Sequence, residues 1–157
     1  MADNIDLRIL GLLQRNARIS NADIARELEM APSAILERIR KLEQRGVLLG
    51  YESRIDAKSV GLGLTAFVFV STAEPGGKKL AGLEFAKFPE AQEVHLVAGD
   101  DCYLVKLRVR DTEDLARVLS ERFGPISSVR GTRSTIVLRT LKESAALPIE
   151  ASPAETE

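Results

Sequence analysis

The apolar residues of this chain follow a helical repeat up to Gly46 and form strand-like runs from residue 64 onwards. In the first stretch they recur three and four residues apart, which places them on one face of a helix. In the second stretch, residues 64–73 (LTAFVFVSTA) are rich in the β-branched and aromatic residues that favour strands. At 157 residues the chain could be one mid-sized domain or two small ones, with a helical part followed by an α+β part.

The bulk composition limits the classes of function that the chain can serve. Hydrophobic residues make up 45% of the chain and charged residues 29%, which is ordinary for a globular protein. The formal net charge is −1, so no overall basic field attracts nucleic acid, and DNA binding must depend on where individual cations lie. Domains of about 60 to 80 residues are marginally stable alone, which favours a homo-oligomer.

Cysteine usage and the lack of long apolar runs predict a cytoplasmic protein. Cys102 is the single cysteine, which excludes an internal disulfide and suits a reducing compartment. No segment reaches the roughly 18 apolar residues of a membrane span, and the N-terminus lacks the apolar core of a signal peptide. The lone His95 and the lone Cys102 cannot form a metal cluster within one chain, so neither a metal nor another cofactor is expected.

Three helices are predicted before Gly46. The first begins after Asp3 and the second after Ser20, and both residues are good N-caps. The third begins at Pro32, which fits the first position of a helix, and stops at Gly46, which suits a helix end. The apolar residues expected to face inward are Ile5, Ile9, Leu12, Leu13, Ile24, Ala25, Leu28, Ile35, Ile39 and Leu42.

The outer face of the third predicted helix is polar and cationic. A short helix, a tight turn and a longer helix with such a face are typical of a helix-turn-helix, whose second helix enters the major groove of DNA. Arg38, Arg40 and Lys41 would then supply affinity, while Ser33 and Glu37 would orient the helix or contact bases. The alternative is a plain three-helix bundle whose charged face is only solvated. The whole outer face comprises Ser33, Leu36, Glu37, Arg40, Lys41 and Gln44, with Arg38 and Arg45 on one flank.

The stretch after the third helix predicts a short strand. Residues 47–51 (VLLGY), followed by residues 52–56 (ESRID), are consistent with a wing that lies beside the DNA backbone. Arg54 would be the phosphate contact of this wing. The alternative for Arg54 is an ordinary surface arginine.

Three motifs in this half resemble the Lrp/AsnC (feast/famine) transcriptional regulators. They are residues 24–28 (IAREL), residues 36–43 (LERIRKLE) and residues 46–51 (GVLLGY), where a Gly-x-x-x-Gly-Tyr exit follows the third helix at fixed spacing. The resemblance implies a winged helix-turn-helix whose third helix reads the major groove. One departure is Ala31, where family members usually carry Ser, so the third helix would lack a side-chain cap at a cost of about 1 kcal/mol.

The elements predicted after residue 63 follow the order βαββαβ. This order is the ferredoxin-like plan, an antiparallel sheet backed by helices. The first strand is apolar on both faces, with Phe67 and Phe69 opposite Val68, which predicts a second copy of the chain against the outer face. In the first helix of this half, Leu80 and Leu83 are expected to pack inward, with Phe88 near its end. The predicted strands cover residues 64–73, 94–98, 103–110 and 129–141, and the predicted helices cover residues 78–88 and 111–123.

The second half resembles the ligand-sensing domain of the same family. Residues 96–100 (LVAGD), 103–106 (YLVK) and 132–138 (TRSTIVL) carry this resemblance, which in total covers roughly residues 3–142. In the family, dimers assemble into octamer-like discs, and amino-acid effectors bind between the dimers. The positions that correspond to the effector site are Gly99, Cys102, Thr132 and Ser134.

Cys102 is a departure that affects the expected effector. Family members commonly carry Asp at this position, and a thiol cannot pair with the ammonium group of an amino acid. Either Asp100 or Asp101 takes over this contact, or the ligand differs, or there is none. The alternative is that residues 99–102 form a plain hairpin turn, with Cys102 a small buried hydrophobe and His95 a structural histidine.

The sequence thus predicts a two-domain α+β regulator of transcription. Its parts are a helix-turn-helix domain (1–50), a wing strand and linker (51–63), a ferredoxin-like dimerisation and sensing domain (64–142) and a flexible tail (143–157). The expected partners are double-stranded DNA, an amino acid or similar small metabolite, and further copies of the chain. The alternatives are a ligand-independent regulator, an assembly module with a vestigial helix-turn-helix, and an enzyme like the sirohaem decarboxylases, for which the single His95 is a poor match.

Overall fold

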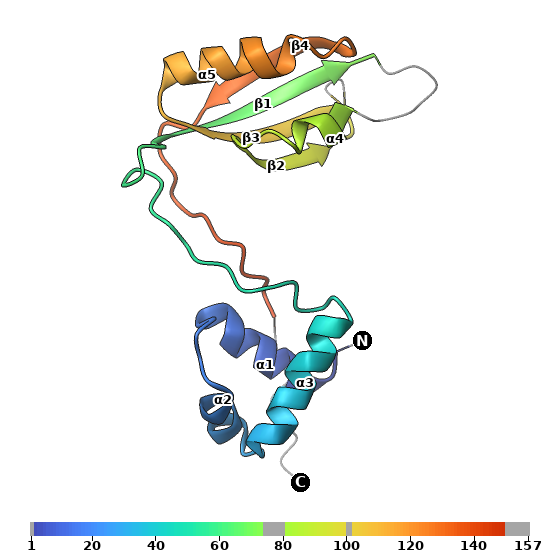
Figure 1. Cartoon of the computed structure of the whole chain (residues 1–157), viewed down its shortest axis with the longest axis vertical. Helices are drawn as coiled ribbons and strands as arrows, with labels where there is room; N and C mark the ends of the chain where they lie inside the picture. The colour runs from blue at the N-terminus through green and yellow to red at the C-terminus, as the bar shows by residue number, and fades with distance from the viewer. Residues whose placement is uncertain (1, 74–80, 100–101, 150–157) are drawn as a thin grey trace. The chain divides into compact units, whose positions relative to one another are not determined.

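The computed structural model describes residues 2–73, 81–99 and 102–149 (Figure 1). The chain divides into two compact units. The helical unit contains the residues up to Arg54 and the segment that begins at Glu143, and the sheet unit contains Ile55–Lys142. Each unit has a hydrophobic core of its own.

The helical unit contains three helices, as predicted. Asp3 caps the first helix by accepting a hydrogen bond from the backbone N–H of Asp6, whose carboxylate accepts one from the N–H of Asp3. This reciprocal pair, a capping box, satisfies backbone donors that the first turn leaves free. Ser20 caps the second helix through the backbone N–H of Asp23. The helices are α1 (Asn4–Arg15), α2 (Asn21–Leu28) and α3 (Pro32–Gln44).

A turn of three residues separates α2 from α3. Glu29 adopts a left-handed conformation with φ at 55°, and the N–H of Met30 donates to the carbonyl of Ala25 at 2.9 Å. These two features reverse the chain quickly enough to place the two helices in a helix-turn-helix. Ile9, Ile24 and Ile35, one from each helix, are fully buried where the helices meet. The predicted inward faces are confirmed, since all ten residues are buried except the half-buried Ile5.

The strand predicted for residues 47–51 does not form. Gly46 adopts a left-handed φ of 65°, and the N–H groups of Val47 and Leu48 both donate to the carbonyl of Leu42. These N–H groups therefore close the end of α3 and are not available to a strand ladder. Throughout residues 47–63 the backbone is irregular, so the wing is a non-regular segment in this structure.

The sheet unit is an antiparallel sheet in the order β2-β3-β1-β4, which confirms the predicted ferredoxin-like βαββαβ plan. A short π-helix continues α5 without a break, and Gly124 ends it, as predicted. The elements are β1 (Leu64–Thr72), α4 (Ala81–Phe85), β2 (Ala91–Leu96), β3 (Tyr103–Val109), α5 (Thr112–Val118), η2 (Leu119–Phe123) and β4 (Val129–Ile136).

Both helices of the sheet unit pack on one face of the sheet. Alternate residues of β1 and β3, such as Val68 and its partner Val105, are fully buried there. Phe85 from α4 and Phe123 from the end of η2 meet over this face, with ring centroids 5.2 Å apart. The Tyr103 ring stands edge-on to Phe85 at 5.3 Å. These aromatic residues thus form one cluster that joins both helices to the sheet.

The apolar face of α4 differs from the predicted one. Leu83 is 63% exposed, whereas Ala81 and Phe85 are buried. The helix is only five residues long, so a single i,i+4 pair defines its buried face, and Leu83 lies opposite that pair. Phe88 packs against the core as predicted, while Leu80 lies outside the described residues.

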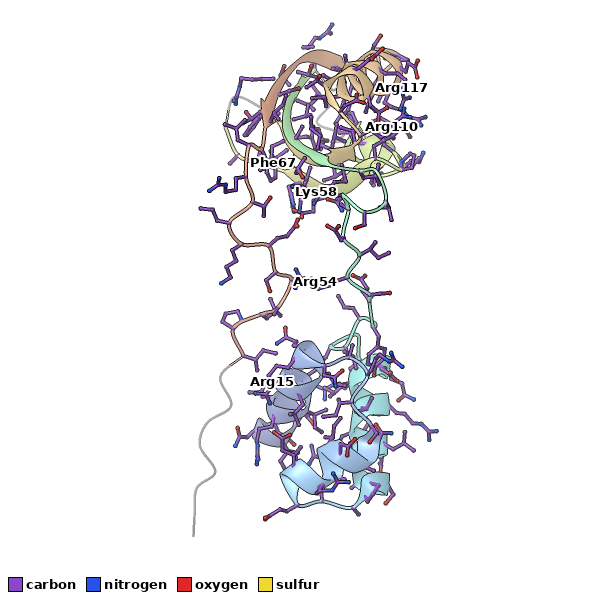
Figure 2. All side chains as sticks on the ribbon, turned by 90° about the vertical axis from the view of Figure 1, so that its left-hand side faces the viewer. Arg15, Arg54, Lys58, Phe67, Arg110 and Arg117 are labelled. Atoms are coloured by element: carbon purple, nitrogen blue, oxygen red, sulfur yellow. The ribbon has the colours of Figure 1, made fainter. Side chains whose placement is uncertain are left out.

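The outer face of the sheet carries the aromatic side chains of β1. Phe67 (Figure 2) and Phe69 are half-buried, and the Arg133 guanidinium lies 4.1 Å from the centroid of the Phe69 ring. Thr135 and Lys106 flank Phe67 in the register of the sheet. The face is thus a mixture of aromatic and cationic residues. The predicted partner on this face stays a prediction.

Part of the predicted tail belongs to the helical unit. The side chain of Gln14 donates to the carbonyl of Leu147 at 3.2 Å and accepts from its N–H at 2.6 Å. Ile149 packs against the core of the helical unit, whereas the Leu147 side chain stays 68% exposed. The segment up to residue 149 therefore contacts α1, while residues 150–157 of the predicted tail lie outside the described part of the chain.

Candidate nucleic-acid interface and effector site

The polar outer face of α3 gathers four of the predicted DNA-contacting residues. Ser33, Glu37, Arg40 and Lys41 are all exposed, and a period of 3.6 residues places them on one side of the helix. The opposite side is buried against α1 and α2. The helix therefore presents a continuous surface of hydroxyl, carboxylate and cationic groups to solvent.

The charged residues of this face differ in whether they are already ion-paired. Glu37 and Lys41 form an ion pair at 2.7 Å, and Lys41 holds the pKa of the Glu37 carboxyl below its usual value. Arg40 precedes Lys41 in the sequence and is exposed. It forms no ion pair with any residue that the structure describes. Arg40 is consequently the cation of this face that can meet a phosphate or a base without first breaking an internal pair.

Arg38 lies beside this face but points to α1. Its Nη1 atom is 2.7 Å from a carboxylate oxygen of Asp3 and 2.7 Å from one of Asp6. The Arg38 side chain is only 29% exposed, and that of Asp6 only 10%. The hydrogen bonds that Arg38 donates to Asp3 and Asp6 raise the pKa of Arg38. The pKa of Asp3 is lowered by the backbone N–H of Asp6 and then by Arg38. Arg38 therefore fixes α3 to the capped start of α1.

The start of α3 has no side-chain cap, as predicted. Ala31 occupies the N-cap position and offers no side-chain hydrogen bond, while Pro32 follows at the first helical position. Proline removes one of the free N–H groups, so the helix start is partly satisfied without a cap. Ser33 lies inside the helix and stays available to an external partner.

Arg54 has an internal partner that the sequence did not predict. The Nη2 atom of Arg54, which is labelled in Figure 2, donates to the backbone carbonyl of Glu143 at 3.1 Å. Two segments of the helical unit that are 89 residues apart in sequence are joined by this bond. The role of Arg54 as a phosphate contact stays a prediction.

The predicted effector residues fall on two sides of β1. The N–H of Cys102 donates to the carbonyl of Val70 at 3.0 Å, and the Cys102 carbonyl accepts from the N–H of Val97 at 2.9 Å. On the other side of β1, Thr132 pairs with Val70 and Ser134 with Val68. Two strand spacings, roughly 10 Å, therefore separate Cys102 from Thr132.

The side chains of the two groups differ in exposure. Cys102 is half-buried and packs against the core of the sheet unit, and its Sγ atom lies 3.8 Å from the carbonyl of Thr72. Thr132 and Ser134 are exposed on β4. Gly99 adopts a φ of 136°, a conformation that favours glycine, while Asp100 and Asp101 lie outside the described residues. The residues thus lie on different strands and differ in exposure.

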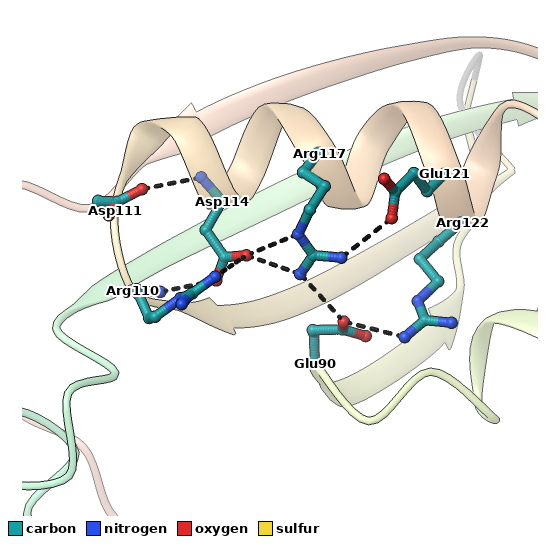
Figure 3. A network of polar contacts seen from close by, with 7 residues as sticks. All are labelled: Glu90, Arg110, Asp111, Asp114, Arg117, Glu121 and Arg122. Carbon is teal, nitrogen blue, oxygen red and sulfur yellow. Dashed lines mark hydrogen bonds and ion pairs between the residues drawn. The ribbon is translucent and has the colours of Figure 1, made fainter.

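A polar network on α5 was missed by the sequence analysis. Asp114 is buried and lies between two arginines (Figure 3): Arg110 donates to it through Nε and Nη2, and Arg117 approaches it to 2.6 Å. Arg110 and then Arg117 hold the pKa of the Asp114 carboxyl well below its usual range. Arg117 also bonds Glu121 at 3.1 Å, and Glu90 accepts from Arg122 at 3.2 Å.

This network joins the end of β3, α5 and the start of β2. The spacing of three and four residues between its members along α5 is visible in the sequence and could have predicted the pairs within the helix. The bond from Arg122 to Glu90, 32 residues away, could not have been predicted from spacing.

The part of the chain that the structure describes has no helix long and apolar enough to cross a membrane. Among the same residues, no three His, Cys, Asp or Glu side chains gather as metal ligands. His95 lies on β2 with its Nε2 atom 3.2 Å from the carboxylate of Glu93, and its side chain is 55% exposed.

Comparison with known families assigns both units. Residues 3–43 match the AsnC-type helix-turn-helix domain, and residues 65–147 match the Lrp/AsnC ligand binding domain. Together with the exposed face of α3, these matches define a DNA-binding regulator of transcription that carries a ligand-binding domain. The chain belongs to the Lrp/AsnC family.

Relatives with the same organisation cover nearly the whole chain. An HTH-type transcriptional regulator from Pyrococcus horikoshii is 36% identical over 148 residues, 94% of this chain and 97% of the relative. The leucine-responsive regulatory protein of Escherichia coli is 33% identical over 150 residues, 94% of this chain and 92% of the relative. A feast or famine regulatory protein from M. tuberculosis, solved with L-methionine, is 31% identical with a TM-score of 0.87, covering 96% of this chain and 100% of the other.

Proposed function

We propose that the outer face of α3 enters the major groove of operator DNA. Arg40 would supply the main cationic contact, with Lys41 at a phosphate and with Ser33 and Glu37 orienting the helix. The observation that carries this proposal is that Arg40 is exposed on the polar face of α3 and has no ion pair among the described residues. Arg38 is less available for such a contact, because its guanidinium is paired with Asp3 and Asp6, and its predicted role in DNA binding stays a prediction.

The test is a salt titration of operator binding by Arg40→Ala. A lost phosphate contact should weaken binding and flatten the plot of log K against log salt by about 0.9 for each bound protomer. Arg130→Ala is the matched control, because it removes an exposed arginine from β4 and should leave affinity and slope unchanged. An Arg40→Ala protein with unchanged affinity and slope would remove Arg40 from the interface.

We propose further that an amino acid or related metabolite modulates DNA binding from the end of the sheet that carries Gly99, Cys102, Thr132 and Ser134. Two solved relatives, from Neisseria meningitidis and M. tuberculosis, contain L-methionine. Because Cys102 and Thr132 lie on opposite sides of β1, a second protomer would complete the site. This arrangement implies a homo-oligomer, with dimers formed through the Phe67 face and further assembled into an octamer or similar ring.

The identity of the effector can be sought by thermal shift with each of the twenty amino acids. A ligand that binds the folded protein raises the melting temperature with concentration, by mass action. Cys102→Asp should increase the response, because a carboxylate can pair with the ammonium group, whereas Cys102→Ser should not. No response from the wild type or from Cys102→Asp would favour a regulator that acts without an amino-acid effector.

A regulatory function, rather than an enzymatic one, fits the side chains of the sheet unit. The single histidine of the chain, His95, is paired with Glu93, and its side chain is 55% exposed on β2. We propose that the protein acts in the cytoplasm, where it meets DNA. An absorbance near 400 nm that stays with the protein after unbound tetrapyrrole has been removed would instead support an enzyme like the sirohaem decarboxylases.

A further inference from the structure

One apolar side chain interrupts the polar face of α3. Leu36 is 37% exposed, whereas the other large apolar residues of α3, which are Ile35, Ile39 and Leu42, are no more than 6% exposed. Leu36 is the fifth residue of the helix and lies one turn after Ser33 and one turn before Arg40. Along the helix axis it therefore lies midway between Ser33 and Arg40, and around the helix it lies at one edge of the surface that the proposed function places in the groove.

The distance from Ser33 to Arg40 along the helix axis corresponds to a few base steps, and Leu36 lies midway along it. Ser33 and Arg40 are seven residues apart, which is roughly 10 Å along the axis. About three base steps of 3.4 Å cover the same length. A side chain at Leu36 thus meets bases that lie between those facing Ser33 and those facing Arg40.

The chemistry of the major groove offers one natural partner for a leucine. Thymine is the base that presents a methyl group there, whereas the other base edges present hydrogen-bond donors and acceptors. Ser33 and Arg40 can donate to such acceptors, but neither recognises a methyl group. An exposed leucine gains by removing its apolar surface from water against that methyl.

We propose that Leu36 is a specificity residue that reads the 5-methyl group of a thymine in each operator half-site. The inference rests on the proposed insertion of α3 into the major groove and adds a base preference to it. It distinguishes T·A pairs from C·G pairs at one position, where hydroxyl and guanidinium groups alone would give weaker discrimination.

The experiment uses the tightest-binding duplex that the full-length protein selects from a random pool. Each thymine is replaced in turn by deoxyuracil, which lacks only the methyl group, and binding is measured for the wild type and for Leu36→Ala. At one position in each half-site, the replacement should weaken wild-type binding about fourfold, the value of one buried methyl group. Leu36→Ala should be insensitive to the replacement at that position, and Leu36→Met, which keeps an apolar side chain of similar length, should retain the sensitivity.

Two results would overturn the assignment of Leu36. One is a wild-type protein for which no thymine is sensitive to loss of its methyl group. The other is a Leu36→Ala protein that is as sensitive as the wild type, because another residue would then read the methyl. Failure of the proposed function itself would be seen separately, as a protein that selects no duplex or whose binding is unaffected by Arg40→Ala. Melting curves of Leu36→Ala keep loss of folding apart from loss of recognition.

Discussion

The outer face of α3 and the hairpin end of the sheet are both candidate sites, but they are built in different ways. On α3, residues from Ser33 to Lys41 share one helix, and the helix period alone brings them together. At the end of the sheet, Cys102 and Thr132 are brought to the same position along β1, because each pairs with Val70 from one side of that strand. A site on one helix needs only that helix, whereas a site spread over several strands depends on the strand order and on any second protomer that packs beside it.

The same contrast separates two arginines of α3. Arg38 and Arg40 are two residues apart, so they point in directions that differ by about 200° around the helix. Arg38 faces α1 and bonds Asp3 and Asp6, while Arg40 faces solvent. Equal charge and similar position in the sequence therefore give one residue that stabilises the helical unit and one that is available to DNA.

The largest expected effect on stability comes from Arg38→Ala. It removes two charge-assisted hydrogen bonds at 2.7 Å and leaves the largely buried Asp6 carboxylate without this partner. The free energy of unfolding of the helical unit should fall by about 2 kcal/mol. Circular dichroism of full-length protein during thermal unfolding would measure the change. Arg40→Ala, the matched control, should shift stability by less than about 0.5 kcal/mol, and equal losses from the two variants would break the distinction between the arginines.

A smaller effect is expected from the C-terminal segment. Ile149 packs on the core of the helical unit, so Ile149→Ala should lower the free energy of unfolding by about 1 kcal/mol. Leu147→Ala is the control, because that side chain is largely exposed and only its backbone bonds Gln14. Urea unfolding would compare the two. If neither variant changes stability, the segment behaves as the flexible tail that the sequence predicts.

The last prediction concerns how stability depends on pH, to which Asp114 contributes. Arg110 and Arg117 lower the pKa of its carboxyl in the folded state, so the unfolded chain takes up a proton first as the pH falls. The stability contributed by Asp114 is fully present above the ordinary aspartate pKa of about 3.9 and is lost below it. Asp114→Asn should therefore show a flatter decline of melting temperature between about pH 5 and pH 2. A decline as steep as that of the wild type would mean that other carboxylates control acid unfolding.

The sequence predicted the elements whose signals are local. Helix periodicity, the caps at Asp3 and Ser20 and the order of strands sufficed for both folds. Residues 47–51 were misjudged because their composition favours a strand, while the N–H groups of Val47 and Leu48 are used to close α3. A strand prediction from composition does not account for such a competing use of backbone donors.

The two sites were also predictable to different degrees, because the sequence shows local spacing but not tertiary contacts. A helical wheel identified the face of Ser33, Glu37 and Arg40, but it could not show that Arg38 bonds acids more than thirty residues away. The bond between Arg54 and Glu143 likewise depends on tertiary structure. The placement of Cys102 and Thr132 on opposite sides of β1 follows from the strand order. Local sequence patterns do not give this order directly; it follows only once the whole fold has been predicted.

The most direct test of the α3 assignment is a gel-shift titration of operator DNA with Arg40→Glu at about 150 mM salt. Reversing the charge of the unpaired cation on the outer face should abolish the specific complex, because the glutamate would repel the phosphates that arginine attracts. Arg130→Glu on β4 should bind as the wild type does, and both variants should melt as the wild type does. Normal operator binding by a folded Arg40→Glu protein would contradict the central claim that the outer face of α3 is the DNA-binding surface.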